Sequence, residues 1–212
     1  GLLSISIGSG AGLASGDSSI SIGADANING LADSIGIGTR ANQNPTGIKS
    51  VSIGYHSGLT TPNERSTNVG DSSGQTNAGA SSSNFGRNSG LLNSGAQSTN
   101  IGTSAGALGA GVGAVNVGWC SGCTGATGSN YTCVGTRAGF AGTGNNVLAL
   151  GYNAGVGFPG GVVPPFTTCI GMNGIRNVAA AVPTNPQNLM LDTTTGELYY
   201  EPLPITIVSA QN

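Results

Sequence analysis

The sequence predicts an all-β fold, a parallel β-roll or β-solenoid of about eleven stacked coils, each roughly 15–16 residues long. Three observations predict this fold. A nine-residue phrase returns along the chain, for example as STNVGDSSG (66–74), SSNFGRNSG (82–90) and STNIGTSAG (98–106). Apolar and small polar residues alternate just before a glycine of that phrase, which is the period of a strand with one buried face. Glycine supplies 39 of the 212 residues, which suits short strands joined by tight corners.

The composition excludes several other classes of protein. A disordered chain combines high charge with few β-branched residues, whereas only 7% of these residues are charged and Ile, Val and Thr are common. The formal net charge is -2 and there is no basic stripe, so nucleic acid is not an expected partner. No apolar run approaches the length that a membrane-spanning helix needs, so we expect no insertion into a membrane.

The copies align on one glycine of the phrase, which we call the anchor glycine. The interval between successive anchors is nearly constant, and only the last interval is distinctly longer. This spacing is too short for a strand–helix–strand unit but sufficient for one solenoid coil. The sequence therefore predicts a repeat domain at 1–174 and a separate C-terminal segment at 175–212. The anchors are Gly8, Gly23, Gly38, Gly54, Gly70, Gly86, Gly102, Gly118, Gly135, Gly151 and Gly171.

Each copy places a short strand directly before its anchor. The residue before the anchor is apolar in all eleven copies, as in Ile53, Val69, Phe85, Ile101 and Val117. The residue three before the anchor is mostly β-branched, and the residue between these two is small or polar. We therefore predict that both apolar columns point into the coil, since a slip of one residue would turn every side chain to the opposite face. An Ile101→Asp substitution should then cost several kcal/mol per chain and prevent assembly.

The residues after the anchor predict a corner and an outward surface. The third residue after it is Ala or Ser in ten copies, which indicates a crowded interior position. The fourth is Gly or Asn in the same copies, and these residues accept left-handed backbone angles most readily. The first residue after the anchor varies most, with Asp71, Arg87 and Thr103 in three neighbouring copies. We predict that this column faces the solvent.

The C-terminal segment predicts a β-hairpin over 188–200. Leu189 and Leu191 alternate on one arm, residues 192–196 form the turn, and Leu198 and Tyr200 alternate on the other arm. Solenoids need their open ends covered. We expect this hairpin to be a C-terminal cap or the junction to a further domain.

The repeats SISIGADAN, SVSIGYHSG and STNIGTSAG resemble the head repeats of trimeric autotransporter adhesins of the YadA type. The repeat NVLALGYNAG is also similar to those of tail-fibre-like proteins of phages, large viruses and bacteria. The segment GMNGIRNVAAAVPTNPQNLMLDTTTGELYYEP resembles the region that precedes an endosialidase-type trimerisation chaperone. The resemblance of the repeats extends over nearly the whole of the predicted repeat domain. It implies a left-handed β-roll made of three identical chains.

A homotrimer is also expected from the small size of one coil. Each predicted coil buries two modest apolar side chains and one Ala or Ser, at about 25 cal/mol per Å² of apolar area. This gain barely offsets the ordering of the coil at roughly 1–2 kcal/mol per residue. Packing three coils around one axis would bury more surface.

The outward column contains the candidate binding residues. Tyr55, Trp119 and Tyr152 occupy it, and His56 follows Tyr55. Exposed aromatic residues suit carbohydrate stacking or contact with a protein. The alternative is that these rings pack on a neighbouring chain of the trimer or on a return loop.

The sequence offers no catalytic or metal-binding pattern. His56 is the one histidine, the aspartates are scattered over loops without a calcium-binding motif, and no serine has the context of a nucleophile. We therefore expect no enzymatic activity, no cofactor and no metal. Cys120 and Cys123 flank a corner, and two readings stay open for them: a disulfide across that corner, or reduced and buried thiols. A zinc site would require a second pair of ligands.

These features favour an extracellular fibre or adhesin, on a virion, a tail fibre or a bacterial cell surface. Its expected partners are further copies of itself and a glycan or protein of a host surface. A purely structural spacer, which holds a binding domain elsewhere in the fibre, is the main alternative. An ice-binding solenoid is less favoured, because the outward column mixes Asp, Arg, Trp and Tyr instead of repeating Thr.

Overall fold

The computed structural model describes residues 3–45, 47–60, 63–76, 78–92, 94–124, 129–140 and 145–154, and the backbone of three further strands at 168–170, 187–191 and 198–202. The chain divides into two compact units, Gly1–Gly174 and Ile175–Asn212. The described residues form strands and turns but no helix. The prediction of an all-β fold is therefore confirmed.

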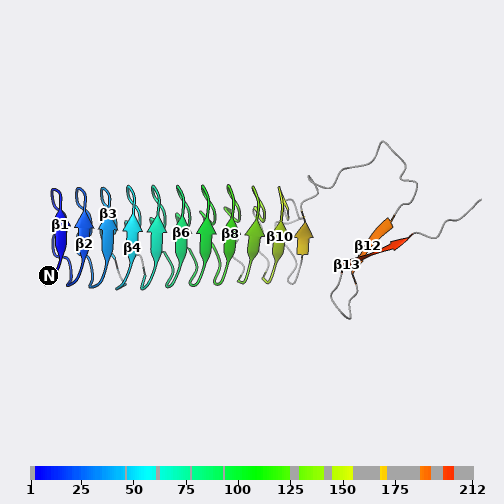
Figure 1. Cartoon of the computed structure of the whole chain (residues 1–212), viewed down its shortest axis with the longest axis horizontal. Helices are drawn as coiled ribbons and strands as arrows, with labels where there is room; N and C mark the ends of the chain where they lie inside the picture. Colours follow the sequence, from blue (N-terminus) through cyan, green and yellow to red (C-terminus); the bar gives the residue numbers. More distant parts are fainter. Residues whose placement is uncertain are drawn as a thin grey trace, which may run out of the picture. The chain divides into compact units, whose positions relative to one another are not determined.

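The first unit is a parallel β-solenoid with one short strand in each coil. Its eleven strands form one sheet whose order follows the sequence, and Figure 1 shows them side by side in a single row. The strands are β1 (Ile5–Ile7), β2 (Ile20–Ile22), β3 (Ile35–Ile37), β4 (Val51–Ile53), β5 (Thr67–Val69), β6 (Ser83–Phe85), β7 (Thr99–Ile101), β8 (Val115–Val117), β9 (Thr132–Val134), β10 (Leu148–Leu150) and β11 (Thr168–Ile170).

The register places each residue over its counterpart in the next copy of the repeat. Asn84, for example, is the partner of Asn68 on one side and of Asn100 on the other. The pairing continues past the anchor, where the Gly86 amide donates to the Val69 carbonyl at 2.8 Å. Identical positions of the repeat therefore form straight columns along the solenoid, with about 4.8 Å between coils. This arrangement explains why some positions of the repeat keep the same type of residue in every copy and others vary.

The anchor has to be glycine because neighbouring coils approach each other closely at this point. The φ angle of Gly102 is 125°, which L side chains rarely adopt. A Cβ atom on Gly102 would lie 2.6 Å from the carbonyl oxygen of Gly118 in the next coil. The predicted corner four residues after the anchor is also confirmed, with φ angles of 54° at Asn27 and 58° at Gly106. A second left-handed position, two residues after the anchor, was not predicted.

The interior of the coil is the reverse of the one that the alternation predicts. The small or polar residue in the middle of the strand is fully buried, as in Asn84 and Asn100, whereas neither of its neighbours in the strand is buried and the apolar Phe85 and Ile101 face outward. The alternation is real, but in the coils from β2 to β8 the interior holds the small or polar column instead of the large apolar side chains. The exposed fractions of the five predicted core residues correct the prediction: 36% for Ile53, 39% for Phe85 and 42% for Ile101, with Val69 and Val117 half-buried.

The other predicted columns lie where the sequence places them. The Ala or Ser column after the anchor is fully buried at Ser73 and Ala105. Asp71 and Arg87 are exposed, and Thr103 is half-buried. The serine that directly precedes each of the strands β2 to β7 is also buried, and the sequence pattern does not predict this. The members of this serine column, at 0–1% exposure, are Ser19, Ser34, Ser50, Ser66, Ser82 and Ser98.

A ladder of asparagine side chains fills the middle of the solenoid from β5 to β8. The Nδ2 atom of each residue donates to the Oδ1 atom of the residue in the preceding coil at 2.8 Å, from Asn116 to Asn100, from Asn100 to Asn84 and from Asn84 to Asn68. All four side chains are fully buried. Each inner amide group is therefore bonded to identical groups above and below it, which satisfies polar atoms that water cannot reach.

The interior amide changes its position in the repeat along the solenoid. In coils with Asn in the middle of the strand, the corner residue is Gly, and a Cβ atom on Gly74, Gly90 or Gly106 would overlap the side chain of that Asn. In the coils of β2 and β3 the middle residue is small and the corner is Asn27 or Asn42. Asn42 Nδ2 donates to Asn27 Oδ1 at 2.8 Å. In the coils of β2, β3 and β5 to β8, one amide group thus occupies the same interior space, either from the strand middle or from the corner. The β4 coil has Ser52 and Gly58 at these two positions and no amide group there.

The interior becomes apolar beyond β8. The buried cluster there contains Tyr131 and Val147, from the column that holds serine in earlier coils, together with Cys133 and Ala149 in the strand middles. All four are 0–2% exposed. The solenoid therefore has a polar interior over most of its described length and a small apolar core near β9 and β10.

The second unit contains the predicted hairpin. β12 (Gln187–Leu191) pairs antiparallel with β13 (Leu198–Pro202), and Leu189 lies opposite Tyr200. The predicted turn at 192–196 lies outside the described residues. The role of the hairpin as a cap stays a prediction.

Candidate functional site

The strands present an apolar surface to the outside of the solenoid, which we call the outer stripe. It consists of the first and third residues of each strand from β1 to β10, and none of these side chains is buried. In the third position every residue is apolar, from Ile7 through Phe85 to Leu150. The first position is apolar in β1 to β4, β8 and β10, and it carries a hydroxyl side chain in β5 to β7 and β9. The outer stripe thus runs along the whole described solenoid.

An apolar surface of this length is unusual on a protein exposed to water. Contiguous exposed apolar patches beyond a few hundred Å² mark protein contacts or ligand sites. The outer stripe repeats at every coil and carries no charged side chain. It therefore fits a partner that is itself apolar and extends along the solenoid axis.

The predicted binding residues lie in a second outward column, one residue after the anchor. Tyr55 is 54% exposed, Trp119 is 55% exposed and Tyr152 is 47% exposed. The amide of Arg137 donates to the Trp119 carbonyl at 2.8 Å, and the amide of Asn153 donates to the Thr136 carbonyl at 3.0 Å. These bonds align the column along the axis. We call it the aromatic column.

Tyr55 and His56 form a local stack apart from the other two aromatic residues. Their ring centroids are 3.8 Å apart and the rings are inclined by 28°. His56 Nε2 is buried and has no hydrogen bond within the described residues. The coils that carry Asp71, Arg87 and Thr103 separate Tyr55 from Trp119. The four predicted residues are therefore not one site.

Trp119 and Tyr152 are closer to each other. They belong to the coils of β8 and β10, and Thr136 of the β9 coil lies between them in the same column. Two steps of about 4.8 Å separate their backbones along the axis. The sequence placed both residues in the outward column, and the spacing follows from the register.

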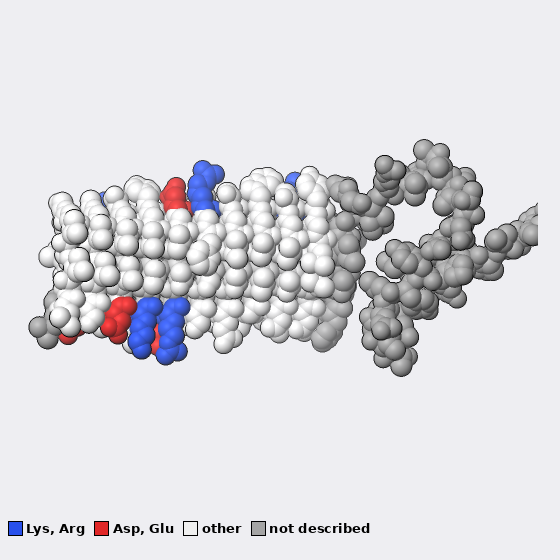
Figure 2. Space-filling view, viewed as in Figure 1, with Lys and Arg blue, Asp and Glu red and all other residues white. Residues whose placement is uncertain are grey.

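Charge is distributed unevenly along the solenoid. In the view of Figure 2 the charged side chains gather over the half nearer β1, and the half nearer β10 is almost free of them. Residues 88–154 contain one charged residue, Arg137. Its guanidinium lies 4.7 Å from the centroid of the Phe140 ring. Trp119 and Tyr152 thus lie on a surface that is nearly uncharged.

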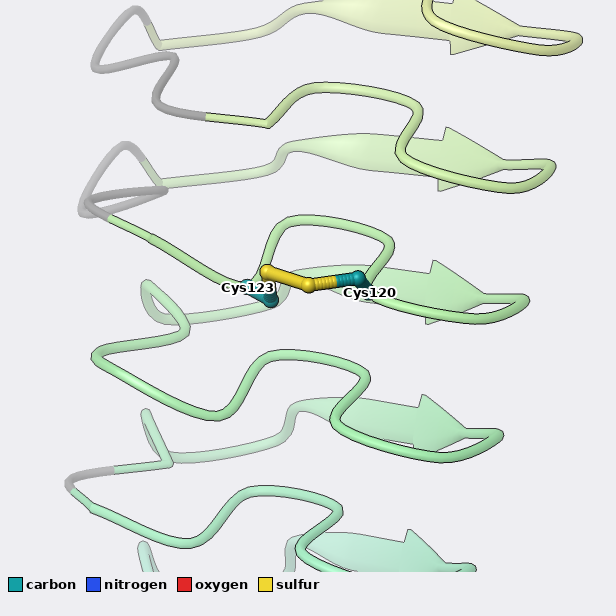
Figure 3. The surroundings of a disulfide bond; sticks show 2 residues. All are labelled: Cys120 and Cys123. Carbon is teal, nitrogen blue, oxygen red and sulfur yellow. A yellow bond between two sulfur atoms is a disulfide. The ribbon is translucent and has the colours of Figure 1, made fainter.

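A disulfide joins Cys120 and Cys123, with Cα atoms 4.8 Å apart. Figure 3 shows that the bond crosses the corner of a single coil and does not link two coils. Arg137 and Phe140 occupy the equivalent positions of the next coil and are also in contact. Side chains two and five residues after the anchor therefore meet over the corner. The reading of Cys120 and Cys123 as a disulfide is the one that the structure supports.

Removing this disulfide should lower the stability of the solenoid modestly. The bond closes a loop of only four residues, so its entropic effect on the unfolded chain is about 2 kcal/mol. We expect a Cys120→Ser/Cys123→Ser variant to unfold at lower denaturant concentration than the oxidised native chain. Reduction should lower the stability of the native chain to that of the variant. Reductant should not change the stability of the variant itself. Equal stability of the variant and the oxidised chain would contradict this expectation.

The described residues show no arrangement typical of a metal or catalytic centre. No group of three or more His, Cys, Asp or Glu side chains comes together in this part of the chain. Among the described residues, no helix is long and apolar enough to cross a membrane. The surfaces that remain as candidates are the outer stripe and the aromatic column.

No protein-family model, curated protein or solved structure matches the chain.

Proposed function

We propose that the chain is a segment of a homotrimeric extracellular fibre or adhesin, which attaches a virion or a bacterial cell to a host surface. The observation that carries the proposal is the outer stripe. A solenoid with a polar interior has its large apolar side chains on the outside. Burying them requires a partner surface whose apolar side chains repeat at the spacing of the coils. Further copies of the same chain, aligned in parallel, have that spacing.

Three copies around one axis fit this requirement best. Most homo-oligomers have closed symmetry, and a cyclic arrangement covers every outer stripe with an equivalent surface. The resemblance to trimeric adhesin and tail-fibre repeats supports three chains in place of two or four. The buried Asn and Ser side chains hold each coil together from within, and the apolar contacts would hold the coils to one another.

The extended form and the outward columns support a role in attachment. A parallel trimer displays every surface feature three times at each level, and multivalent display raises avidity by about 10²–10⁴ over a single weak contact. The Cys120–Cys123 disulfide supports an oxidising environment, such as the outside of a cell. We propose no enzymatic activity and no cofactor, and a glycan or protein of the host surface as partner.

Binding of the purified segment to surface molecules tests the attachment function. We expect the fluorescently labelled trimer to bind at least one glycan or host-surface protein on arrays of both classes, and to lose most of this avidity as a single chain. A trimer that binds nothing on either array would favour the purely structural spacer, which holds a binding domain elsewhere in the fibre.

A further inference from the structure

The C-terminal half of the aromatic column has the geometry of a binding surface for an extended ligand. Trp119 and Tyr152 present half-exposed rings in alternate coils, with Thr136 between them. The inter-coil hydrogen bonds of Arg137 and Asn153 fix the three positions in one line along the axis. The two aromatic residues are therefore held on rigid backbone about 9–10 Å apart, twice the spacing of neighbouring strands.

The surroundings of the two rings are polar but almost uncharged. Arg137 is the one charged residue in 88–154, and its guanidinium lies against the Phe140 ring. Within the aromatic column, Thr103 and Thr136 supply hydroxyl groups. A ligand here meets two aromatic surfaces and neutral hydrogen-bonding groups, and no patch of either charge. With a single charged side chain, such a surface favours a neutral ligand over an acidic polysaccharide or a charged protein.

We propose that this surface binds a neutral, linear polysaccharide that lies parallel to the solenoid axis. Sugar rings carry apolar C–H faces that stack on aromatic side chains, and their hydroxyl groups match Thr136. In an extended β-1,4-linked chain, alternate sugars present equivalent faces, and two sugar units span a length similar to two coils. One sugar stacks on Trp119, the next faces Thr136 and the third stacks on Tyr152. This inference rests on the proposed attachment function and names the class of its ligand.

The spacing distinguishes this ligand from other neutral glycans. An α-1,4-linked chain coils and does not present equivalent faces at regular intervals along a straight line. A single sugar or a disaccharide reaches only one ring. Affinity should therefore depend on both the linkage and the length of the glycan.

Calorimetric titration of the native trimer with soluble cello- and chito-oligosaccharides of increasing length tests the inference. We expect affinity to rise steeply once the oligosaccharide reaches three sugars, and malto-oligosaccharides of equal length to bind much more weakly. Trp119→Ala and Tyr152→Ala should each weaken binding about tenfold, because each variant loses one of the two stacking contacts. The matched control is Tyr55→Ala in the same column, which should leave affinity unchanged.

Two further probes, an acidic polysaccharide and host-surface proteins, distinguish failure of this inference from failure of the attachment function. The mass of each variant shows whether it still forms the trimer. Binding only to an acidic polysaccharide or to host-surface proteins would overturn the inference and leave the attachment function in place. Unchanged oligosaccharide affinity of Trp119→Ala, or loss of the trimer in that variant, would also overturn the inference. Binding of the native trimer to none of these probes would contradict both.

Discussion

Replacing Asn100 with aspartate should unfold or severely destabilise the solenoid, although the two side chains have nearly the same shape. Asn100 Nδ2 donates to Asn84 Oδ1 at 2.8 Å, and Asn100 Oδ1 accepts from Asn116 Nδ2 at the same distance. The aspartate would keep the oxygen that accepts from Asn116, but it would place a second, charged oxygen against the side-chain Oδ1 of Asn84. A buried charge without a partner costs roughly 3–5 kcal/mol. Denaturant unfolding followed by circular dichroism measures this loss for each chain.

A surface asparagine provides the matched control for the interior substitution. Asn145 is exposed, and its Oδ1 accepts from the Ser129 amide at 2.8 Å. Asn145→Asp preserves this acceptor and should change the stability by much less. Stability of Asn100→Asp should also rise at acid pH, because a protonated carboxyl is neutral and can donate to Asn84. Equal stability of Asn100→Asp and Asn145→Asp at neutral pH would contradict the asparagine ladder.

An Ile101→Asp substitution should prevent assembly of the proposed trimer and leave the coil intact. Ile101 is 42% exposed in the single chain, so a carboxylate there remains in water while the chain is alone. In a trimer that covers the outer stripe, the same substitution would bury three carboxylates near one axis, which costs several kcal/mol. Light scattering after size exclusion should show a single chain, and circular dichroism should still show β-structure.

Thr103→Asp is the control for this substitution. Thr103 is half-buried, belongs to the same coil and lies on the outward column beyond the anchor. The Thr103→Asp chain should still assemble as the native chain does. An Ile101→Asp chain that still forms trimers would show that the outer stripe is not the interface. An Ile101→Asp chain that loses all β-structure would instead support the inward face that the alternation of residues suggests.

The stacking of the coils is predictable from the sequence because it depends on spacing alone. Eleven anchors at nearly constant intervals require equivalent residues to lie over one another, and the register of all ten strand pairs agrees. The corner at Asn27 and Gly106 is predictable because few residue types accept its backbone angles. The hairpin strands are predictable from the alternation of Leu189, Leu191, Leu198 and Tyr200, which brackets a turn.

The prediction of which strand face is buried is wrong, because it depends on the hydrophobicity of the side chains and not on their volume. Ile101 and Phe85 suggest a buried face, but the interior of the coils from β2 to β8 holds only small side chains and, in most of these coils, one amide group. Two signals in the sequence identify the true interior. The column before the strand holds serine in six successive copies, from Ser19 to Ser98. Asn also exchanges with Gly between the strand middle and the corner, as expected of two positions that share one space.

The candidate site was predictable in part. The exposure of Tyr55, Trp119 and Tyr152 follows from their place in the variable column after the anchor. The stacking of Tyr55 on His56 depends on side-chain rotamers, which periodicity does not determine. The outer stripe is not predictable as a functional surface, because the alternation in the sequence indicates an inward face for its residues.

The mass of the native chain in solution tests most directly whether the outer stripe is covered by further copies. Sedimentation equilibrium of the purified segment measures it independently of molecular shape. We predict three times the chain mass of 20.6 kDa, with no smaller species at micromolar concentration. A stable, folded species of 20.6 kDa would contradict the trimer and leave the apolar outer surface without a partner.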